Sequence, residues 1–210
     1  MKIKAVIFDM DGVLIDARDW HFEALNQALE LFGYSISRYD HLVTFDGLPT
    51  KKKLEMLSAE RGLPKELHNF INHMKQQYTM QHVFMKCKPI FQHQYALSKL
   101  KAAGYGIAVA SNSIRATIDM MMEKADLLKY LDFYLSNQDV SQAKPNPEIY
   151  IKAIARFGYS PKECLIVEDN KNGVKAAISS GANLLKVADP HEVSWQNISC
   201  RLKELESEES

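Results

Sequence analysis

Short apolar runs and longer amphipathic stretches alternate along most of the chain. A short continuous apolar run bounded by turn residues is typical of a strand buried on both faces of a parallel sheet. Apolar residues three and four positions apart, followed by a glycine, are typical of a helix. The predicted strands are residues 4–8, 106–110, 133–136, 164–167 and 183–187.

Helical patterns separate the strands that follow residue 89. They cover residues 91–103, 114–123, 146–157 and 171–180. Strands and helices that alternate in this way indicate βαβ units, in which the strands are parallel and the crossovers right-handed. We therefore predict an α/β fold with a Rossmann-like parallel sheet at its core. The chain after residue 187, rich in Glu and Ser, is predicted to end in a polar tail.

A helical block interrupts this alternation directly after the first strand. Its predicted helices are residues 18–32, 51–61 with Thr50 as N-cap, and 64–81, and no strand pattern occurs among them. We predict that residues 16–85 form an inserted α-helical cap domain, a lid over the strand ends. Residues 1–15 and 86–210 would then form the α/β catalytic core.

Composition and charge exclude several classes of partner. Lys plus Arg and Asp plus Glu number 26 each, which gives no global attraction to nucleic acid or to an anionic membrane. No apolar run approaches the ~18 residues that cross a bilayer, and the start does not resemble a signal peptide. We expect a cytoplasmic protein, a monomer or weak dimer. The cysteines form no CxxC pattern, which argues against a disulfide framework or a zinc site: Cys87, Cys164 and Cys200.

Polar side chains follow four of the five predicted strands. They are Asp9 and Asp11, Ser111 and Asn112, Lys144, and Glu168 with Asp169. Parallel strands bring such groups to one edge of the sheet, where open α/β folds bind their ligands. Several carboxylates share a small site only with a cation, because their mutual repulsion would otherwise protonate some of them. The oxygen ligands favour Mg²⁺ as that cation.

This combination of groups suits phosphoryl transfer. A lysine, a hydroxyl group, backbone amides at a helix start and a divalent cation together stabilise a phosphoryl group. One carboxylate can attack phosphorus to form an aspartyl-phosphate, and its neighbour can pass a proton to the leaving oxygen. The sequence therefore predicts an enzyme acting on a small phosphorylated metabolite.

Four short motifs carry a resemblance to a known family. They are Phe8-Asp9-Met10-Asp11-Gly12-Val13, Ser111-Asn112-Ser113, Lys144-Pro145-Asn146-Pro147-Glu148-Ile149-Tyr150 and Val167-Glu168-Asp169-Asn170. In this order the motifs resemble those of the haloacid dehalogenase superfamily of phosphotransferases. The helical insert is similar to the cap of the branch that contains β-phosphoglucomutase and phosphoglycolate phosphatase.

The resemblance implies a role for each acidic or basic residue of the motifs. Asp9 would be the nucleophile and a Mg²⁺ ligand. Asp11 would be the general acid/base and would bind the metal through its backbone carbonyl. Lys144 would neutralise charge on the nucleophile and the phosphoryl group, and Asp169 would complete the metal ligands, with Glu168 as a further ligand or beside them.

The remaining candidates would contact the phosphoryl group or the rest of the substrate. Ser111, helped by the backbone amide of Asn112, would hold a phosphoryl oxygen. Arg115 either contacts the phosphate of the substrate or only lies on the surface of a helix. His21 matches a histidine that is proposed in this branch to help Asp11 respond to cap closure, with a surface histidine as the alternative. Lys51, in the run of residues 51–53, either meets an anionic substrate or belongs to a solvated helix face.

The function expected from this resemblance is a Mg²⁺-dependent phosphatase that hydrolyses a small phosphomonoester, similar to a sugar phosphate. Asp11 argues against a dehalogenase, because the dehalogenases lack that acid. One alternative is a phosphomutase of the β-phosphoglucomutase type, although residues 51–53 supply lysines where those mutases carry an arginine. The other is a non-catalytic member of the fold that only binds a ligand.

Overall fold

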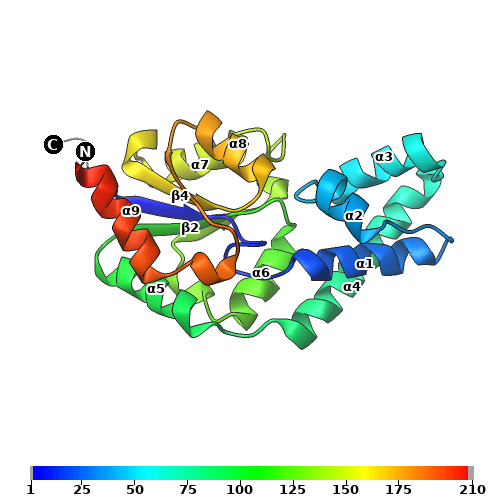
Figure 1. The fold of residues 1–210 in the computed structure, drawn as a ribbon, viewed down its shortest axis with the longest axis horizontal. Helices are drawn as coiled ribbons and strands as arrows, with labels where there is room; N and C mark the ends of the chain where they lie inside the picture. The colour runs from blue at the N-terminus through cyan, green and yellow to red at the C-terminus, as the bar shows by residue number, and fades with distance from the viewer. Residues whose placement is uncertain (1, 208–210) are drawn as a thin grey trace. The chain divides into compact units, whose positions relative to one another are not determined.

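The centre of the protein is a five-stranded parallel sheet with strand order β3-β2-β1-β4-β5. We describe residues 2–207 from a computed structural model (Figure 1). The strands are β1 (Ala5–Phe8), β2 (Gly106–Ala110), β3 (Phe133–Leu135), β4 (Cys164–Glu168) and β5 (Asn183–Lys186). The predicted fold class and all five predicted strands are confirmed.

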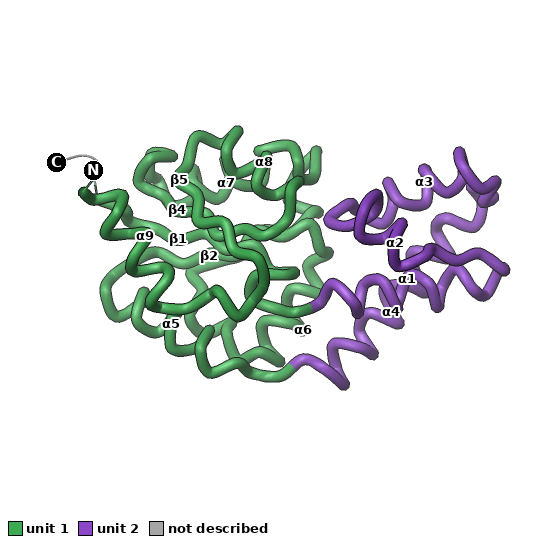
Figure 2. The backbone as a smooth tube through the Cα atoms, viewed as in Figure 1, with its two compact units in different colours: residues 1–16, 88–210 green, residues 17–87 purple. Residues whose placement is uncertain are grey.

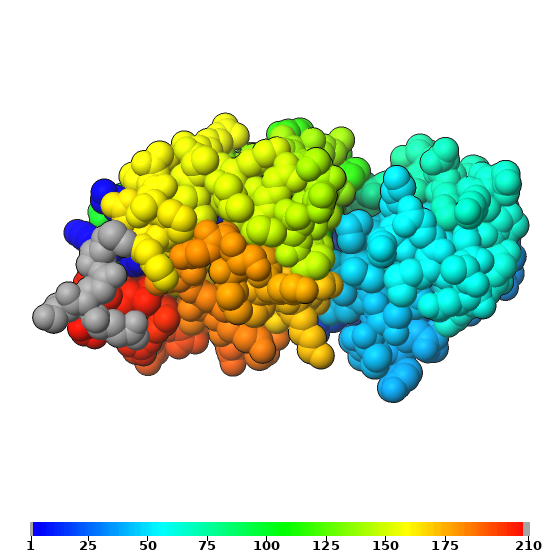
Figure 3. All heavy atoms as spheres, turned by 90° about the horizontal axis from the view of Figure 1, so that it is seen from above, coloured from blue at the N-terminus to red at the C-terminus, as the bar shows by residue number. Residues whose placement is uncertain are grey.

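Helices cover both faces of the sheet (Figure 1). On one face lie α7 (Glu148–Phe157) and α8 (Lys171–Ser179), whose segments Figure 3 shows side by side in yellow and orange. On the other lie α5 (Phe91–Ala102), α6 (Arg115–Lys124) and α9 (Trp195–Ser207). Because side chains alternate along a strand, Ile7 and Ile166 join the core beneath α7 and α8.

The C-terminal helix α9 corrects one prediction. Residues after 187 were expected to form a polar tail, but α9 buries Ile198, Leu202 and Leu205 and packs against α5. These residues are spaced four and three apart, which places them on one helical face. The prediction of a polar tail is therefore wrong as far as residue 207. The last residues, 208–210, lie outside the described part of the chain.

The chain divides into two compact units, drawn in green and purple in Figure 2. Unit 1 contains residues 1–16 and 88–210, and unit 2 contains residues 17–87. Unit 2 is helical throughout: α1 (Arg18–Glu30), α2 (Arg38–Asp40), the π-helical turn η1 (His41–Phe45), α3 (Thr50–Arg61), the turn η2 (Lys65–Leu67) and α4 (His68–Lys86). The role of this segment as a cap stays a prediction.

Unit 2 has a hydrophobic core of its own. Leu25 and Leu29 of α1 pack with Leu54 and Leu57 of α3 and with Ile71 of α4. Thr50, predicted as the N-cap of α3, is instead its first residue; Pro49 occupies the cap position, and no side chain caps the helix. None of the helices within residues 2–207 is long and apolar enough to span a membrane.

Short 3-10 turns complete the connections of unit 1. They are η3 (Leu128–Tyr130), η4 (Asn137–Asp139), η5 (Pro161–Glu163) and η6 (Pro190–Glu192). Two of them, η4 and η5, begin with a serine capping box. The serine side chain accepts a hydrogen bond from the N–H of the acid three residues later, and the side chain of that acid accepts one from the serine N–H. They hold in place the loops that leave β3 and enter β4.

Candidate active site

The register of the sheet brings the predicted site residues to one edge. Phe8, the last residue of β1, pairs with Val109 of β2 and Val167 of β4. The residues that follow, Asp9 and Glu168 among them, therefore leave neighbouring strands at the same level. The Asp9 N–H still donates to the Val167 carbonyl at 3.0 Å, so its backbone is fixed by the sheet.

The turn after β1 depends on a glycine. Gly12 has a φ of +89°, in the left-handed region that favours glycine. A Cβ at this position would lie 2.2 Å from Asp169 Oδ2. Gly12 thus lets the turn that carries Asp11 pass directly against the carboxylate of Asp169.

Lys144 joins two carboxylates in the interior. Its Nζ lies 2.7 Å from Asp9 Oδ1 and 2.7 Å from Glu168 Oε1, and its side chain is 4% exposed. Burial alone would lower the pKa of Lys144, but the charges of Asp9 and Glu168 outweigh it and raise this pKa above its ordinary value. Lys144 is therefore a permanent cation beside Asp9.

Glu168 is held by donors on both of its oxygens. Oε1 also accepts from the Tyr150 hydroxyl at 2.6 Å, and Oε2 accepts from the N–H groups of Asp169 at 3.0 Å and Asn170 at 3.3 Å. The Tyr150 ring lies 4.6 Å from Lys144 Nζ, within reach of a cation–π interaction. Burial raises the pKa of Tyr150 well above its ordinary value, so its hydroxyl stays a donor.

Gly173 of α8 leaves the space that Glu168 fills. A Cβ there would lie 1.7 Å from Glu168 Oε1. Gly173→Ala is expected to destabilise the protein by about 1–3 kcal/mol, as overpacking does, and to lower activity by displacing Glu168 from Lys144. Urea unfolding and steady-state assays measure both effects.

Helix propensity alone predicts the opposite sign for Gly173→Ala, a gain of up to about 1 kcal/mol. The matched control is Ser179→Ala at an exposed position of the same helix, which should change stability and activity little. A Gly173→Ala protein more stable than the wild type and fully active would show that Glu168 needs no space there.

Two serines organise the end of β2. Ser113 Oγ donates to Asp11 Oδ2 at 2.9 Å, and the Ser113 N–H donates to Ser111 Oγ at 3.0 Å. Ser111 is fully buried. Its hydroxyl and the carboxylate of Asp11, the predicted general acid/base, are thus linked through one residue, Ser113, to which the sequence alone gave no role.

The side chain of Asn112 fixes the loop of Lys144. Asn112 Oδ1 accepts from the Lys144 N–H at 3.0 Å, and Asn112 Nδ2 donates to the Lys144 carbonyl at 3.3 Å. These two hydrogen bonds resemble the pair that joins two facing residues in a β-sheet. The side chain of Asn112 therefore positions Lys144, and the contact of the Asn112 backbone amide with a phosphoryl oxygen stays a prediction.

Glu148 closes the same loop from its other side. Its Oε2 accepts from Ser141 Oγ at 2.6 Å and from the N–H groups of Ser141 and Gln142, both at 3.0 Å, and Lys152 Nζ lies 2.7 Å from Oε1. The bond from Lys152 and those from Ser141 and Gln142 lower the pKa of Glu148 to about 2. The loop of Lys144 is thus tied to the first turn of α7.

Glu148→Gln is expected to lower the melting temperature at neutral pH. A lowered carboxyl pKa contributes stability that is complete above its ordinary value near 4.5 and is lost as pH falls toward about 2. The difference between the two proteins should therefore be constant from pH 5 to 8 and shrink below pH 4.5. Thermal melts across this range measure it, with the exposed Glu123→Gln as control; a difference that does not change with pH would contradict the prediction.

Three carboxylates are arranged as a metal site would require. One oxygen from each of Asp9, Glu168 and Asp169 lies within 4.8 Å of the others. Burial, followed by the charge of Glu168, raises the pKa of Asp9 well above its ordinary value against the opposing charge of Lys144. The all-oxygen donor set and the excess of negative charge both fit a hard divalent cation.

Three other predicted residues are described by the contacts within their own units. Arg115 is exposed on α6, where its Nη2 lies 2.5 Å from Asp139 Oδ1. His21 belongs to unit 2, and its Nδ1 is 3.2 Å from Nζ of Lys75, a residue that sequence reasoning missed. Lys51 is exposed, whereas Lys53, two residues on, is 7% exposed. Their contacts with a substrate stay predictions.

A parallel α/β sheet with a carboxylate-bound lysine and a carboxylate cluster at its strand ends is the architecture of a phosphate-processing hydrolase. The chain belongs to the haloacid dehalogenase-like hydrolases, whose family model matches residues 6–187. The family resemblance noted in the sequence is thereby confirmed.

Named relatives support the same class. The phosphorylated carbohydrates phosphatase of Thermotoga maritima is 31% identical over 182 residues, which are 85% of this chain and 82% of the relative. The β-phosphoglucomutase structure from Clostridium difficile has a TM-score of 0.82 at 20% identity, over 96% of this chain and 98% of that one. CbbY of Rhodobacter sphaeroides, solved in complex with phosphate, has a TM-score of 0.78 at 20% identity, over 88% and 85%. These structures share the fold, and the relatives named as phosphatases confirm the predicted enzyme class.

Proposed function

We propose that this protein is a Mg²⁺-dependent phosphatase that hydrolyses a small phosphorylated carbohydrate through an aspartyl-phosphate on Asp9. The observation that carries the proposal is the contact of the buried Lys144 cation with Asp9 Oδ1, next to the carboxylates of Glu168 and Asp169. The name of the Thermotoga maritima relative supports the choice of substrate class.

Asp9, Asp169 and the backbone carbonyl of Asp11 would hold the Mg²⁺, with Glu168 as a further ligand or beside them. When bound, Mg²⁺ would neutralise the excess negative charge and polarise the phosphoryl group. A cation among these carboxylates also favours the charged form of Asp9, which is the form that attacks phosphorus.

In the proposed reaction, the protein's own groups act as nucleophile, acid and base. The Asp9 carboxylate forms a bond to phosphorus while the bond from phosphorus to the sugar oxygen breaks, and Asp11 gives that oxygen its proton. Asp11 then takes a proton from the water that attacks the aspartyl-phosphate, and this step releases phosphate and restores Asp9. Lys144 stays protonated throughout and offsets the charge that gathers on the phosphoryl oxygens.

Ser111 and the Asn112 amide would hold the phosphoryl oxygens, and Ser113 would orient Asp11 through its 2.9 Å hydrogen bond. We further propose that unit 2 is a cap domain that selects the leaving group, with His21 and a lysine of residues 51–53 as its polar groups. We expect the enzyme to work in the cytoplasm as a monomer or weak dimer.

The test is phosphate release from a panel of sugar phosphates, nucleotides and phosphorylated carboxylic acids, with Mg²⁺ or with EDTA. We expect turnover of at least one sugar phosphate that is lost in EDTA and restored by added Mg²⁺. Conversion of a glucose 1-phosphate to its isomer without phosphate release would instead identify a phosphomutase. No turnover of any compound in the presence of Mg²⁺ would favour the non-catalytic alternative.

A further inference from the structure

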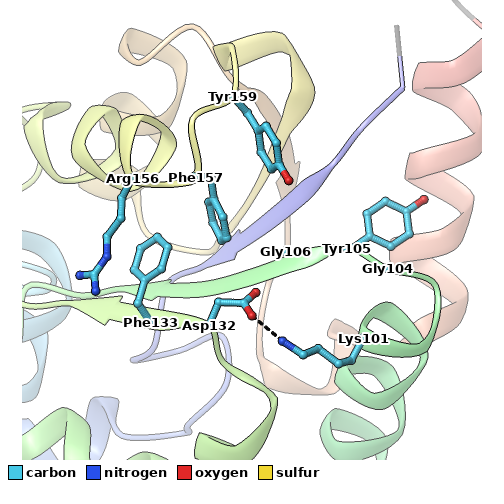
Figure 4. A pocket seen from close by; sticks show the side chains of 9 residues that line it. All are labelled: Lys101, Gly104, Tyr105, Gly106, Asp132, Phe133, Arg156, Phe157 and Tyr159. Carbon is cyan, nitrogen blue, oxygen red and sulfur yellow. Dashed lines mark hydrogen bonds and ion pairs between the residues drawn. The ribbon is translucent and has the colours of Figure 1, made fainter.

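A shallow cavity of about 490 Å³, largely open to solvent, lies in unit 1 at the end of the sheet opposite the candidate active site (Figure 4). It lies where β2 and β3 begin and α7 ends, and it is lined by Lys101, Gly104, Tyr105, Gly106, Asp132, Phe133, Arg156, Phe157 and Tyr159. Its volume is in the range of small-molecule sites in proteins. The length of β2, roughly 16 Å at ~3.3 Å per residue, separates its first residue Gly106 from the site edge at Ser111.

One side of the cavity is aromatic. The rings of Phe133 and Phe157 have centroids 4.7 Å apart, and those of Phe157 and Tyr159 are nearly parallel at 5.8 Å. Gly106 makes this packing possible, because a Cβ there would lie 2.6 Å from Phe157 Cε1. These rings also cover the core beneath α7, and they form the apolar side of the cavity (Figure 4).

Polar groups stand at the other side. Lys101 donates to Asp132, and Asp132 Oδ2 accepts from the Ile107 N–H at 2.7 Å, which fixes this carboxylate (Figure 4). The backbone of Gly104 and Gly106 also lines the cavity, with Phe157 packed against Gly106. The cavity therefore combines an aromatic side with a fixed hydrogen-bonding pair.

Arg156 gives the lining of the cavity its net positive charge. Its guanidinium lies 4.4 Å from the centroid of the Phe133 ring, and no carboxylate within residues 2–207 forms an ion pair with it. An arginine stacked on an aromatic ring keeps its N–H groups available at its edge, in the fork that fits a carboxylate or phosphate. With Lys101 and Asp132 cancelling each other, the lining carries one net positive charge.

We propose that this cavity is a second ligand site, for a small molecule that joins a flat aromatic ring to a carboxylate or phosphate group. The ring would lie against Phe157 and Tyr159, and the anionic group would bind the guanidinium of Arg156. The inference does not depend on the proposed phosphatase activity, because it uses none of the residues at the catalytic edge.

A matched pair of probes tests the charge requirement. Naphthalene-2-carboxylate and its neutral amide have nearly the same shape, and neither is a phosphatase substrate. We expect the carboxylate to bind the wild-type protein roughly 10- to 100-fold more tightly than the amide, as a charge-assisted hydrogen bond of about 1.5–3 kcal/mol implies. The readout is the shift of backbone amide resonances during titration, which should move at Gly104, Gly106 and Ile107 and not at Gly12 or Ser111.

Two variants test whether Arg156 causes the difference in affinity between the two probes. Arg156→Gln should bring the affinity for the carboxylate down to that for the amide, whereas Lys175→Gln, an exposed residue of α8 that also removes one positive charge, should leave it unchanged. Equal affinity for the two probes in the wild type, shifts at Gly12 and Ser111 instead, or unchanged binding in Arg156→Gln would each overturn the proposal.

Discussion

Asp9→Asn should lower the rate of phosphate release by roughly 10⁴-fold or more, because the amide cannot attack phosphorus. The fold should survive. Asp9 is buried beside other carboxylates, and burial with the charge of Glu168 raises its pKa, so a neutral isostere relieves this repulsion. Steady-state assays with Mg²⁺ and thermal melts in EDTA measure the two effects, and the melting temperature should equal or exceed that of the wild type.

The control for Asp9→Asn is Asp16→Asn, an exposed carboxylate a few residues further along the chain. It should retain wild-type turnover. If purified Asp9→Asn kept wild-type turnover, Asp9 would not be the nucleophile. If it lost turnover together with a large drop in melting temperature, its carboxylate would be structural, which would contradict the repulsion between Asp9 and Glu168.

Lys144→Met should cost about 3–5 kcal/mol of folding free energy in EDTA at neutral pH, because it leaves two buried carboxylates without their cation. Activity should fall to the same background as in Asp9→Asn. Without Lys144 the pKa of Asp9 rises further, because the opposing positive charge is gone, so the folded state holds a proton that the unfolded state releases. The loss of stability should therefore be largest near pH 7.5 and shrink as pH falls toward 5.

Urea unfolding at both pH values, in EDTA and then in Mg²⁺, measures this pattern. A bound cation replaces part of the missing charge, so Mg²⁺ should stabilise Lys144→Met more than it stabilises the wild type. Lys162→Met, an exposed lysine, is the control and should behave like the wild type. A Lys144→Met protein with wild-type stability in EDTA at pH 7.5 would contradict the charged, buried network.

The strands and most helices were predictable because their signals are local. The runs at residues 106–110 and 164–167 are continuous and apolar, and glycines such as Gly62 and Gly158 stop helices in the left-handed conformation. The candidate site followed from the same signals, because parallel strands in register deliver Asp9 and Glu168 to one edge whatever the helices do.

Side-chain directions across elements could not be predicted in the same way. Tyr150 appeared only as the last letter of a motif, and its bond to Glu168 depends on which face α7 turns to the sheet. Gly173 carries no pattern at all; its role exists only because Glu168 comes from another strand. The apolar spacing of Ile198, Leu202 and Leu205 is typical of a helix such as α9, but the Glu and Ser residues around them made the segment resemble a polar tail.

The central place of β1 in the sheet has a consequence for the protein during its synthesis. Phe8 is made early, yet its pairing partners Val109 and Val167 are made much later. Until the ribosome has passed Glu168, β1 lacks a neighbour on one edge, and an unpaired apolar strand is prone to aggregate. Unit 2 has its own core and can fold during this interval, whereas Asp9 meets Glu168 and Lys144 only once β4 has emerged. The nascent chain should therefore depend on chaperones for longest in the segment that carries Asp9.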